Sequence, residues 1–223
     1  DGEGKVSRGL VVNDPNMLMI PAEVTLDGGN NTSMAYSYAL WVKVDNYAHD
    51  KQGTNLISKN TIKDKWPHNN WGDLWVQIRP EIQAGNSECK QYHAANEVSF
   101  NTFGWTSHDC PRESMMSTGY SLNPGVWNHI VVTQSSDKQQ KIYFNGKCVA
   151  GPNNFSSSSL RENSSDNRID GTVHANVYIG GGGVYKAGLN AVIDEVQVWN
   201  KPLTDAEVLR AMQGYAANEV PEG

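Results

Sequence analysis

The sequence predicts an all-β protein, built as an antiparallel sandwich of two sheets with one short helix near the C-terminus. Three observations support this prediction. Short apolar segments with an alternation of period two recur along the chain. Asn, Asp, Gly and Pro turn signals separate them, and one segment carries a helix start signal. Many short strands with turns between them are typical of a β-sandwich.

The expected strands are spread over most of the chain. They comprise residues 9–12, 17–21, 38–44, 73–80, 128–134, 141–149, 176–180 and 191–199. Asn145 and Gly146 fall inside one of these segments, and this dipeptide strongly favours a tight hairpin turn. The sequence therefore predicts a hairpin at this position.

The helix is expected to begin at Thr204. Glu207 follows three residues later, and the two residues form a capping box that satisfies the first free amide groups of a helix. We expect the helix to be held against the sandwich by Leu203, Val208 and Leu209.

Length and composition fit one globular domain. The chain has 223 residues, of which 38% are hydrophobic and 19% charged, as in ordinary folded proteins. We expect residues 1–8 to be a linker or a trimmed N-terminus, residues 9–215 to form the domain, and residues 216–223 to be a tail. A net charge of -6 argues against nucleic acid as a partner, and no apolar run approaches the ~18 residues typical of a membrane-spanning helix.

Five motifs occur in a fixed order. They are a strand containing Trp41, the Gly-x-Trp-x-His segment 125–129, a strand ending in Asn-Gly at 145–146, the glycine run 180–183 and the closing segment 193–207. In this order the motifs resemble the LamG-like jelly-roll family of the concanavalin A-like lectin/glucanase superfamily, over residues 9–213. The resemblance implies two antiparallel sheets packed face to face, one of them curved.

Asp194 stands out in the last expected strand. Alternation places it on the same side as Val192 and Val196, toward the core, where a carboxylate needs hydrogen bonds, a counter-charge or a metal. The resemblance implies a structural calcium ion at Asp194, with Asn13 and Asp14 as further ligands. At that position Val12-Asn13-Asp14 replaces the family's usual Phe-Asp-Gly. The alternative is that Asp194 accepts hydrogen bonds from backbone amides or a hydroxyl and holds no metal.

Two cysteines and two histidines gather in one Trp-containing region. Cys89, His93, His108 and Cys110 could form a tetrahedral zinc site, but their spacing fits no known zinc pattern. A disulfide between Cys89 and Cys110 is the favoured interpretation, and an extracellular setting would support it. Cys148 is left over in an expected strand, as a small buried apolar residue.

Catalysis is not expected. Retaining glycosidases need two carboxylates about 5 Å apart, and in this superfamily they usually stand on one strand as Glu-x-Asp-x-Glu or Glu-x-Asp-x-x-Glu. No Glu in this sequence has an Asp two places later. Asp194 and Glu195 are adjacent, so they are expected on opposite faces of their strand.

Tryptophans in polar loops provide the functional signal. Indole rings can stack on sugar rings while polar side chains bond the hydroxyls, and loops on a sandwich often carry binding sites. The predicted ligand-binding residues are Trp66, His68, Trp71, Trp75, Gln77, Arg79 and Trp105. The alternative for the loop tryptophans is that they fill small satellite cores.

The function predicted from the sequence is that of a non-catalytic binding module for a glycan or glycoconjugate, in an extracellular or cell-surface protein. A protein-binding or adhesion module that recognises a receptor is one alternative, since other LamG-like domains act in this way. A diverged glycoside hydrolase or lyase is the other. The fold alone does not decide between them.

Overall fold

A computed structural model describes residues 2–3, 8–13, 17–20, 35–46, 54–59, 74–79, 97–102, 115–137, 139–154, 177–181 and 189–214. Within these ranges the protein is almost entirely β-structure with one helix, which confirms the predicted fold class. None of the described helical structure is long and apolar enough to cross a membrane.

The strands are short, and most are joined to their sheet neighbours in antiparallel order. They are β1 (Gly2–Glu3), β2 (Arg8–Val12), β3 (Leu18–Ile20), β4 (Tyr36–Asn46), β5 (Thr54–Lys59), β6 (Leu74–Arg79), β7 (Glu97–Thr102), β8 (Met115–Ser121), β9 (Trp127–Gln134), β10 (Gln139–Phe144), β11 (Lys147–Asn154), β12 (Val177–Ile179) and β13 (Asn190–Trp199).

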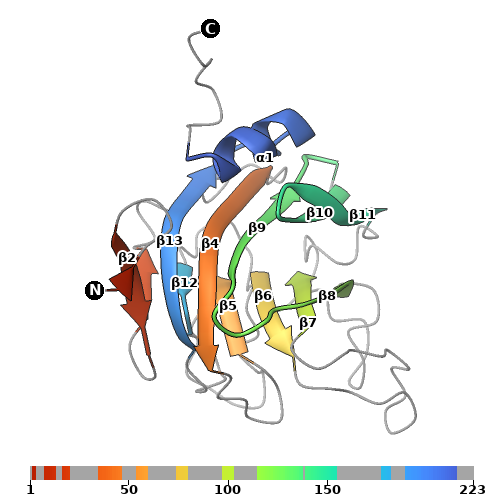
Figure 1. Cartoon of the computed structure of the whole chain (residues 1–223). Coiled ribbons are helices and arrows are strands. Elements are labelled where there is room, and N and C mark those ends of the chain that lie inside the picture. Colours follow the sequence, from red (N-terminus) through yellow and green to blue (C-terminus); the bar gives the residue numbers. More distant parts are fainter. Residues whose placement is uncertain are drawn as a thin grey trace, which may run out of the picture.

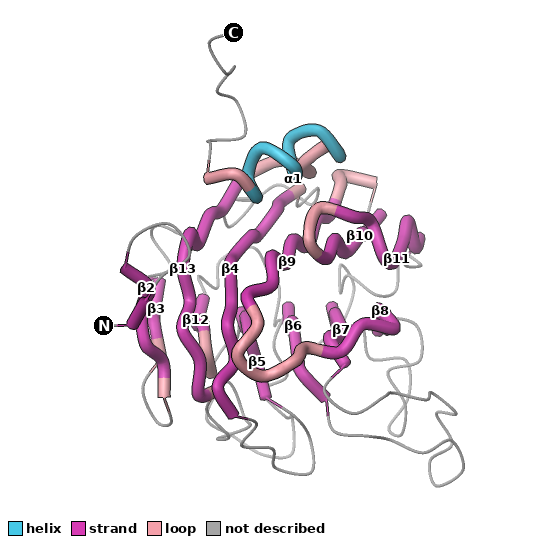
Figure 2. The backbone as a smooth tube through the Cα atoms, viewed as in Figure 1, coloured by secondary structure: helices cyan, strands magenta, loops and turns pink. Residues whose placement is uncertain are grey.

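Two sheets form the sandwich. One has seven strands in the order β1-β2-β13-β4-β9-β10-β11, and the other has six in the order β3-β12-β5-β6-β7-β8. The seven-stranded sheet lies in front of the six-stranded sheet in Figure 1, and Figure 2 shows the same two layers as tubes. The strand order is far from the sequence order, so segments distant in the chain become neighbours.

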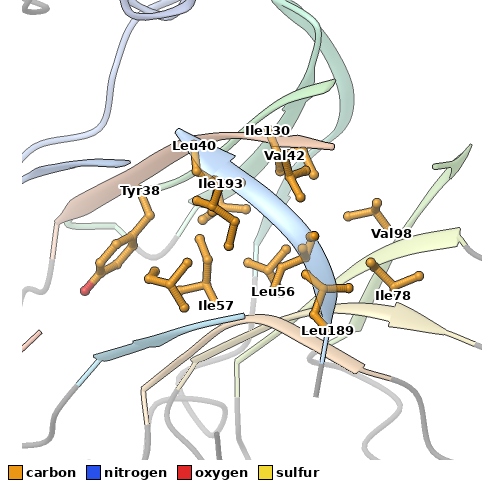
Figure 3. Packing of buried hydrophobic residues seen from close by; sticks show 14 of the residues in the cluster. Tyr38, Leu40, Val42, Leu56, Ile57, Ile78, Val98, Ile130, Leu189 and Ile193 are labelled. Atoms are coloured by element: carbon orange, nitrogen blue, oxygen red, sulfur yellow. The ribbon is translucent and has the colours of Figure 1, made fainter. Parts of the chain in front are cut away.

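The hydrophobic core fills the space between the sheets. Leu40, Val42, Ile130 and Ile193 enter it from the seven-stranded sheet, and Ile78 enters from the other, all with at most 1% exposure. Figure 3 shows these side chains meeting between the two layers. In most strands alternate residues point away from this core. Each sheet therefore has an outer face whose side chains do not contribute to the core.

Helix α1 (Asp205–Met212) packs on the outer face of the seven-stranded sheet. Thr204 caps it, and its hydroxyl and backbone exchange hydrogen bonds with Glu207 as the capping box predicts. Partial burial by itself raises the pKa of Glu207, but hydrogen bonds from Lys201 and Thr204 outweigh it and lower the pKa to about 2. Figure 1 shows the helix beside the ends of β13 and β4.

A second apolar cluster fixes the helix to this face. It contains Ala39, Val131, Tyr143, Leu203, Val208 and Ala211. Leu203 and Val208 thus have the predicted role. Leu209 is outside this cluster and 46% exposed, but its Cδ2 lies beside Gly146 between β10 and β11, so it also contacts the sandwich. Ala211 is the further helix residue in the cluster. Cys148 packs against it, half-buried, much as its sequence position suggested.

The predicted Asn145-Gly146 hairpin turn joins β10 to β11. Both residues have positive φ, 50° and 79°, as the tight hairpin turn requires. Gly146 is also constrained by space, because a Cβ there would lie 2.7 Å from Cδ2 of Leu209. The turn therefore forms part of the surface on which the helix packs.

Each strand expected from the sequence is present, but the expectation is incomplete. It lacked β1 and three strands of the six-stranded sheet, namely β5, β7 and β8. Polar residues alternate with apolar ones along most of β7, and β5 contains only two apolar residues, Leu56 and Ile57, so the apolar signal in each is weak. Both β5 and β7 contribute residues to the outer face of the six-stranded sheet.

Candidate functional site: the polar face of the six-stranded sheet

The outer face of the six-stranded sheet is polar where its inner face is apolar. On β6, Val76 and Ile78 enter the core and are fully buried. Gln77 lies between them and therefore points to the opposite face. On β7, Val98 enters the core between Glu97 and Ser99. The alternation places Gln77, Glu97 and Ser99 together on the outer face.

The strand register aligns three polar residues in a row across β5, β6 and β7. Asn55 lies opposite Gln77, and Gln77 lies opposite Ser99. The three side chains have 2%, 1% and 0% exposure. Nε2 of Gln77 donates to Oδ1 of Asn55 at 2.8 Å. We call Asn55, Gln77 and Ser99 the polar row.

Glu97 occupies the next position of the same face and is 2% exposed. The backbone N–H of Gly119 donates to its Oε1 at 2.7 Å. Gly119 has a φ of 68° and lies where the register of β7 and β8 shifts, so the bulge aims a backbone donor at the carboxylate. The Thr118 hydroxyl fixes this segment by donating to the carbonyl of Val98 at 2.7 Å.

The predicted binding residues divide into three groups. Gln77 is placed on the polar row. Trp75 and Arg79 lie on β6, two residues to either side of Gln77, with Trp75 opposite Ser58 and Arg79 opposite Glu97 in the register. Their side chains are not described. Trp66, His68, Trp71 and Trp105 lie outside the described residues.

The described strands do show where the tryptophan-containing segments join the sheet. Lys59 at the end of β5 lies opposite Leu74 at the start of β6, which lies opposite Thr102 at the end of β7. Residues 60–73 and 103–114 therefore both connect to the same end of the six-stranded sheet. The two segments were selected from sequence alone, and their common attachment is a property of the fold.

Sequence reasoning missed Asn55, Glu97, Ser99 and Thr118. A signal existed in the segment 97–102, where polar residues at 97, 99 and 101 alternate with Val98 and Phe100. That pattern is typical of a strand with one polar face.

The outer face of the seven-stranded sheet differs, because the helix covers part of it. His129 is 1% exposed, and its ring lies 5.1 Å from that of Trp41. Burial lowers the pKa of His129 to about 4, so the imidazole is neutral near pH 7. Nε1 of Trp41 donates to the carbonyl of Met212 at 3.3 Å. Trp41 therefore has a structural role, joining the sheet to the end of the helix.

The prediction that Asp194 points toward the core is wrong. Ile193 is the core residue, and Asp194 pairs with Trp41 on the outer face. A bulge follows, in which Glu195 has a φ of 49°, and after it Val196 packs against the core. The extra residue changes the phase of the alternation. Oδ1 of Asp194 accepts a hydrogen bond from the N–H of Glu195 at 2.9 Å.

Asn13 and Asp194, two of the three expected calcium ligands, lie apart along the seven-stranded sheet. Val12 pairs with Ala191, so Asn13 lies about four residues along the sheet from Asp194, or roughly 13 Å at the usual strand rise. Calcium binds oxygens about 2.3–2.6 Å away, so Asn13 and Asp194 do not share one ion. Asp14 lies outside the described residues, among which no three His, Cys, Asp or Glu side chains form a possible metal site.

The predicted disulfide and its zinc alternative also lie outside the described part of the chain. Neither Cys89 nor Cys110 is described, and the same holds for His93 and His108. The disulfide stays a prediction.

Comparison with solved structures gives similar folds at low sequence identity. Domain 4 of AbnA, a GH43 extracellular arabinanase from Geobacillus stearothermophilus, solved with arabinotriose, has a TM-score of 0.58 and 19% identity over 95% of this chain and 80% of that one. Trypanosoma rangeli sialidase has a TM-score of 0.56 and 13% identity over 95% of this chain, which spans 28% of the sialidase.

A candidate carbohydrate-binding protein from Bacteroides ovatus has a TM-score of 0.50 and 14% identity, over 90% of this chain and 46% of that one. No curated protein sequence matches the chain. The family model Laminin_G_3 matches residues 21–209. The chain therefore belongs to this family, Laminin_G_3 of the concanavalin A-like lectin/glucanases superfamily.

Proposed function

We propose that the protein is a carbohydrate-binding module and that its ligand binds on the polar face of the six-stranded sheet. The observation that carries the proposal is the polar row of Asn55, Gln77 and Ser99, on the face turned away from the core. Buried polar groups destabilise a fold unless they are hydrogen-bonded. Asn55 and Gln77 bond each other, whereas the hydroxyl of Ser99 has no partner among the described residues, so the row leaves a polar group that a ligand can satisfy.

The similar structures support the same class of ligand. One was solved with arabinotriose, and another, the sialidase, was solved with a difluorosialic acid. The Trp66, Trp71 and Trp105 segments attach at one end of the polar face. Flat apolar rings next to spaced polar groups suit a sugar, which has apolar C–H faces and a rim of hydroxyls.

We further propose that the module is not catalytic. Glu97 is the one carboxylate whose side chain is described on the polar face, and a retaining glycosidase needs two about 5 Å apart. An extracellular or cell-surface location belongs to the same proposal, in keeping with the extracellular arabinanase that contains a similar domain.

A protein receptor is the second candidate partner. Leu10, Val11, Met17 and Met19 have exposures of 42%, 37%, 42% and 48%, and they lie on or next to β2 and β3, toward one edge of each sheet. Exposed apolar side chains grouped at a sheet edge are typical of protein contacts. Such a partner would bind at the edge and not on the polar face.

A glycan array, followed by calorimetric titration of the best ligand with and without calcium, tests the proposal. Gln77→Ala should weaken binding by about tenfold, the usual effect of removing a buried hydrogen-bonding group. Gln140→Ala is the matched control. Gln140 is also 1% exposed, and its Nε2 bonds another glutamine, Gln134, at 2.6 Å, but it lies in the seven-stranded sheet.

The control variant should lose stability and keep its affinity. If no glycan binds, or if both variants lose affinity equally, the site on the polar face is wrong.

A further inference from the structure

Two serines on the polar face have the same burial but different hydrogen bonding. Ser58 and Ser99 are both 0% exposed. The hydroxyl of Ser58 donates to the carbonyl of Gly181 at 3.1 Å. The hydroxyl of Ser99 has no partner among the described residues. Buried hydroxyls in proteins nearly always have a partner, so Ser99 marks a position where an external donor or acceptor is expected.

The side chains described around Ser99 do not supply that partner. Gln77 lies opposite Ser99 in the register, but its Nε2 is engaged by Asn55 at 2.8 Å. On the other side Ser99 lies opposite Ser117 of β8. The row is composed of amides and hydroxyls without a charged residue. In the adjacent position Arg79 lies opposite Glu97, one residue of each sign.

We propose that this row selects an uncharged sugar chain and that Ser99 is a specificity-determining residue that bonds one of its hydroxyls. The proposal rests on the carbohydrate-binding function proposed above and names the ligand class. A sugar hydroxyl can donate and accept, as the hydroxyl of Ser99 can. The two groups form a neutral pair that satisfies the buried atom.

An acidic sugar fits this surface poorly. The row itself contains no cationic residue, and Arg79, the basic residue beside it, lies opposite Glu97 in the register. Burying a charge on the row without a counter-charge is strongly unfavourable. Glu97 would also place a carboxylate two residues along the strand from Ser99, with its Oε1 already bonded to Gly119. Two negative charges placed this close repel each other. Sialylated and uronate-containing chains should therefore bind more weakly than their neutral counterparts.

Ser99→Ala and Ser58→Ala form a matched pair for the first test, in the full chain. Each removes one hydroxyl from the same face at the same burial. In Ser99→Ala we expect affinity for the best neutral glycan to fall by about tenfold, while the melting temperature of the free protein stays unchanged or rises, because an unpartnered buried group is removed. In Ser58→Ala we expect the reverse, a lower melting temperature with unchanged affinity.

A merely structural serine would not give this separation. If Ser99→Ala binds like the wild type, or loses affinity only as far as it loses stability, Ser99 does not contact the ligand and the inference is wrong. In that case wild-type binding to glycans, together with the Gln77→Ala result, would leave the proposed function standing.

The second test uses an array of neutral oligosaccharides alongside their acidic counterparts, such as lactose with sialyllactose and galactotriose with trigalacturonate. The best neutral glycans should bind at least about tenfold more tightly than acidic ones, in line with the effect of an unpaired buried charge. Preference for the acidic members would overturn the ligand class. Absence of binding to any glycan would instead overturn the proposed function itself.

Discussion

The two outer faces of the sandwich are built from the same alternation but are used differently. On the seven-stranded sheet the outward residues include Ala39, Val131 and Tyr143, and helix α1 buries them. On the six-stranded sheet the outward residues of the central strands are Asn55, Gln77 and Ser99. The first face carries a second apolar cluster outside the hydrophobic core, and the second face carries polar groups.

Hydrogen bonding separates the two faces further. Beneath the helix, Tyr143 donates to Asp205 at 2.7 Å, and burial together with this bond raises the pKa of Tyr143 above its usual range. The Ser37 hydroxyl donates to the carbonyl of Lys201 at 2.7 Å and accepts from the N–H of Leu203 at 3.0 Å. A serine on this face is thus doubly bonded, whereas Ser99 is not. The helix-covered face serves stability, and we assign the polar face to binding.

The largest effect is expected on the helix-covered face. Leu203→Ala should lower the free energy of unfolding by about 2–5 kcal/mol, because it leaves a cavity in the second apolar cluster. Urea unfolding measures this. Leu209→Ala is the comparison variant. Leu209 is 46% exposed and lies beside the Gly146 turn, so its replacement should cost less, about 1 kcal/mol. Glycan affinity should be unaffected in both variants. A specific loss of affinity in Leu203→Ala would show that the two faces do not have separate roles in stability and binding.

His129 should make stability depend on pH. Its pKa is about 4 in the folded state against 6.5 for an ordinary histidine, so between these values the unfolded chain binds more protons. Stability should fall as pH drops from 6.5 to 4, by about 3 kcal/mol in total from this group. Urea unfolding across this range, compared with His129→Gln, isolates the contribution. An identical pH profile in the variant would show that His129 is not held neutral by burial.

The capping box should contribute a smaller amount. Thr204→Ala removes the hydroxyl that accepts from the N–H of Glu207 and should cost about 1 kcal/mol. Thr204→Ser keeps the hydroxyl and should cost much less. Thermal unfolding of the two variants gives the comparison, and equal losses would mean that the cap hydroxyl does not stabilise the helix.

Asp194 is expected to give the smallest effect. Asp194→Ala removes the acceptor of the hydrogen bond from the N–H of Glu195 at the bulge and should cost about 0.5 kcal/mol, in the presence of calcium or of a chelator. Calcium at Asp194 remains a prediction from the family resemblance. If added calcium raises the melting temperature of the wild type but not of Asp194→Ala, that prediction is correct and the hydrogen bond alone is an insufficient explanation.

The sequence predicted the fold well because its strong signals are local. Asn145-Gly146 specifies its own turn, and Thr204 with Glu207 specifies its own helix start. Asp194 shows the limit of such reasoning. Alternation predicts a side chain's direction only while the strand is regular, and the bulge at Glu195 reverses it. Nothing in the pattern of neighbouring valines indicates where the extra residue lies.

The candidate site was partly predictable for a related reason. Gln77 was found because it lies between two strongly apolar neighbours in β6. Asn55 and Ser99 were missed because they lie in strands with weaker apolar patterns, and because their relation to Gln77 depends on register across the sheet. Pairing between strands far apart in the chain is set by the whole fold and cannot be read from one short segment.

The central claim is that the ligand binds on the polar face, and one measurement tests it directly. Backbone amide chemical shifts should be followed by NMR while the best neutral glycan is titrated into the full chain. We expect the largest shift changes in β5, β6 and β7, around Asn55, Gln77 and Ser99, with little change in α1 and β13. Changes confined to the helix-covered face, or to β2 and β3, would contradict the claim.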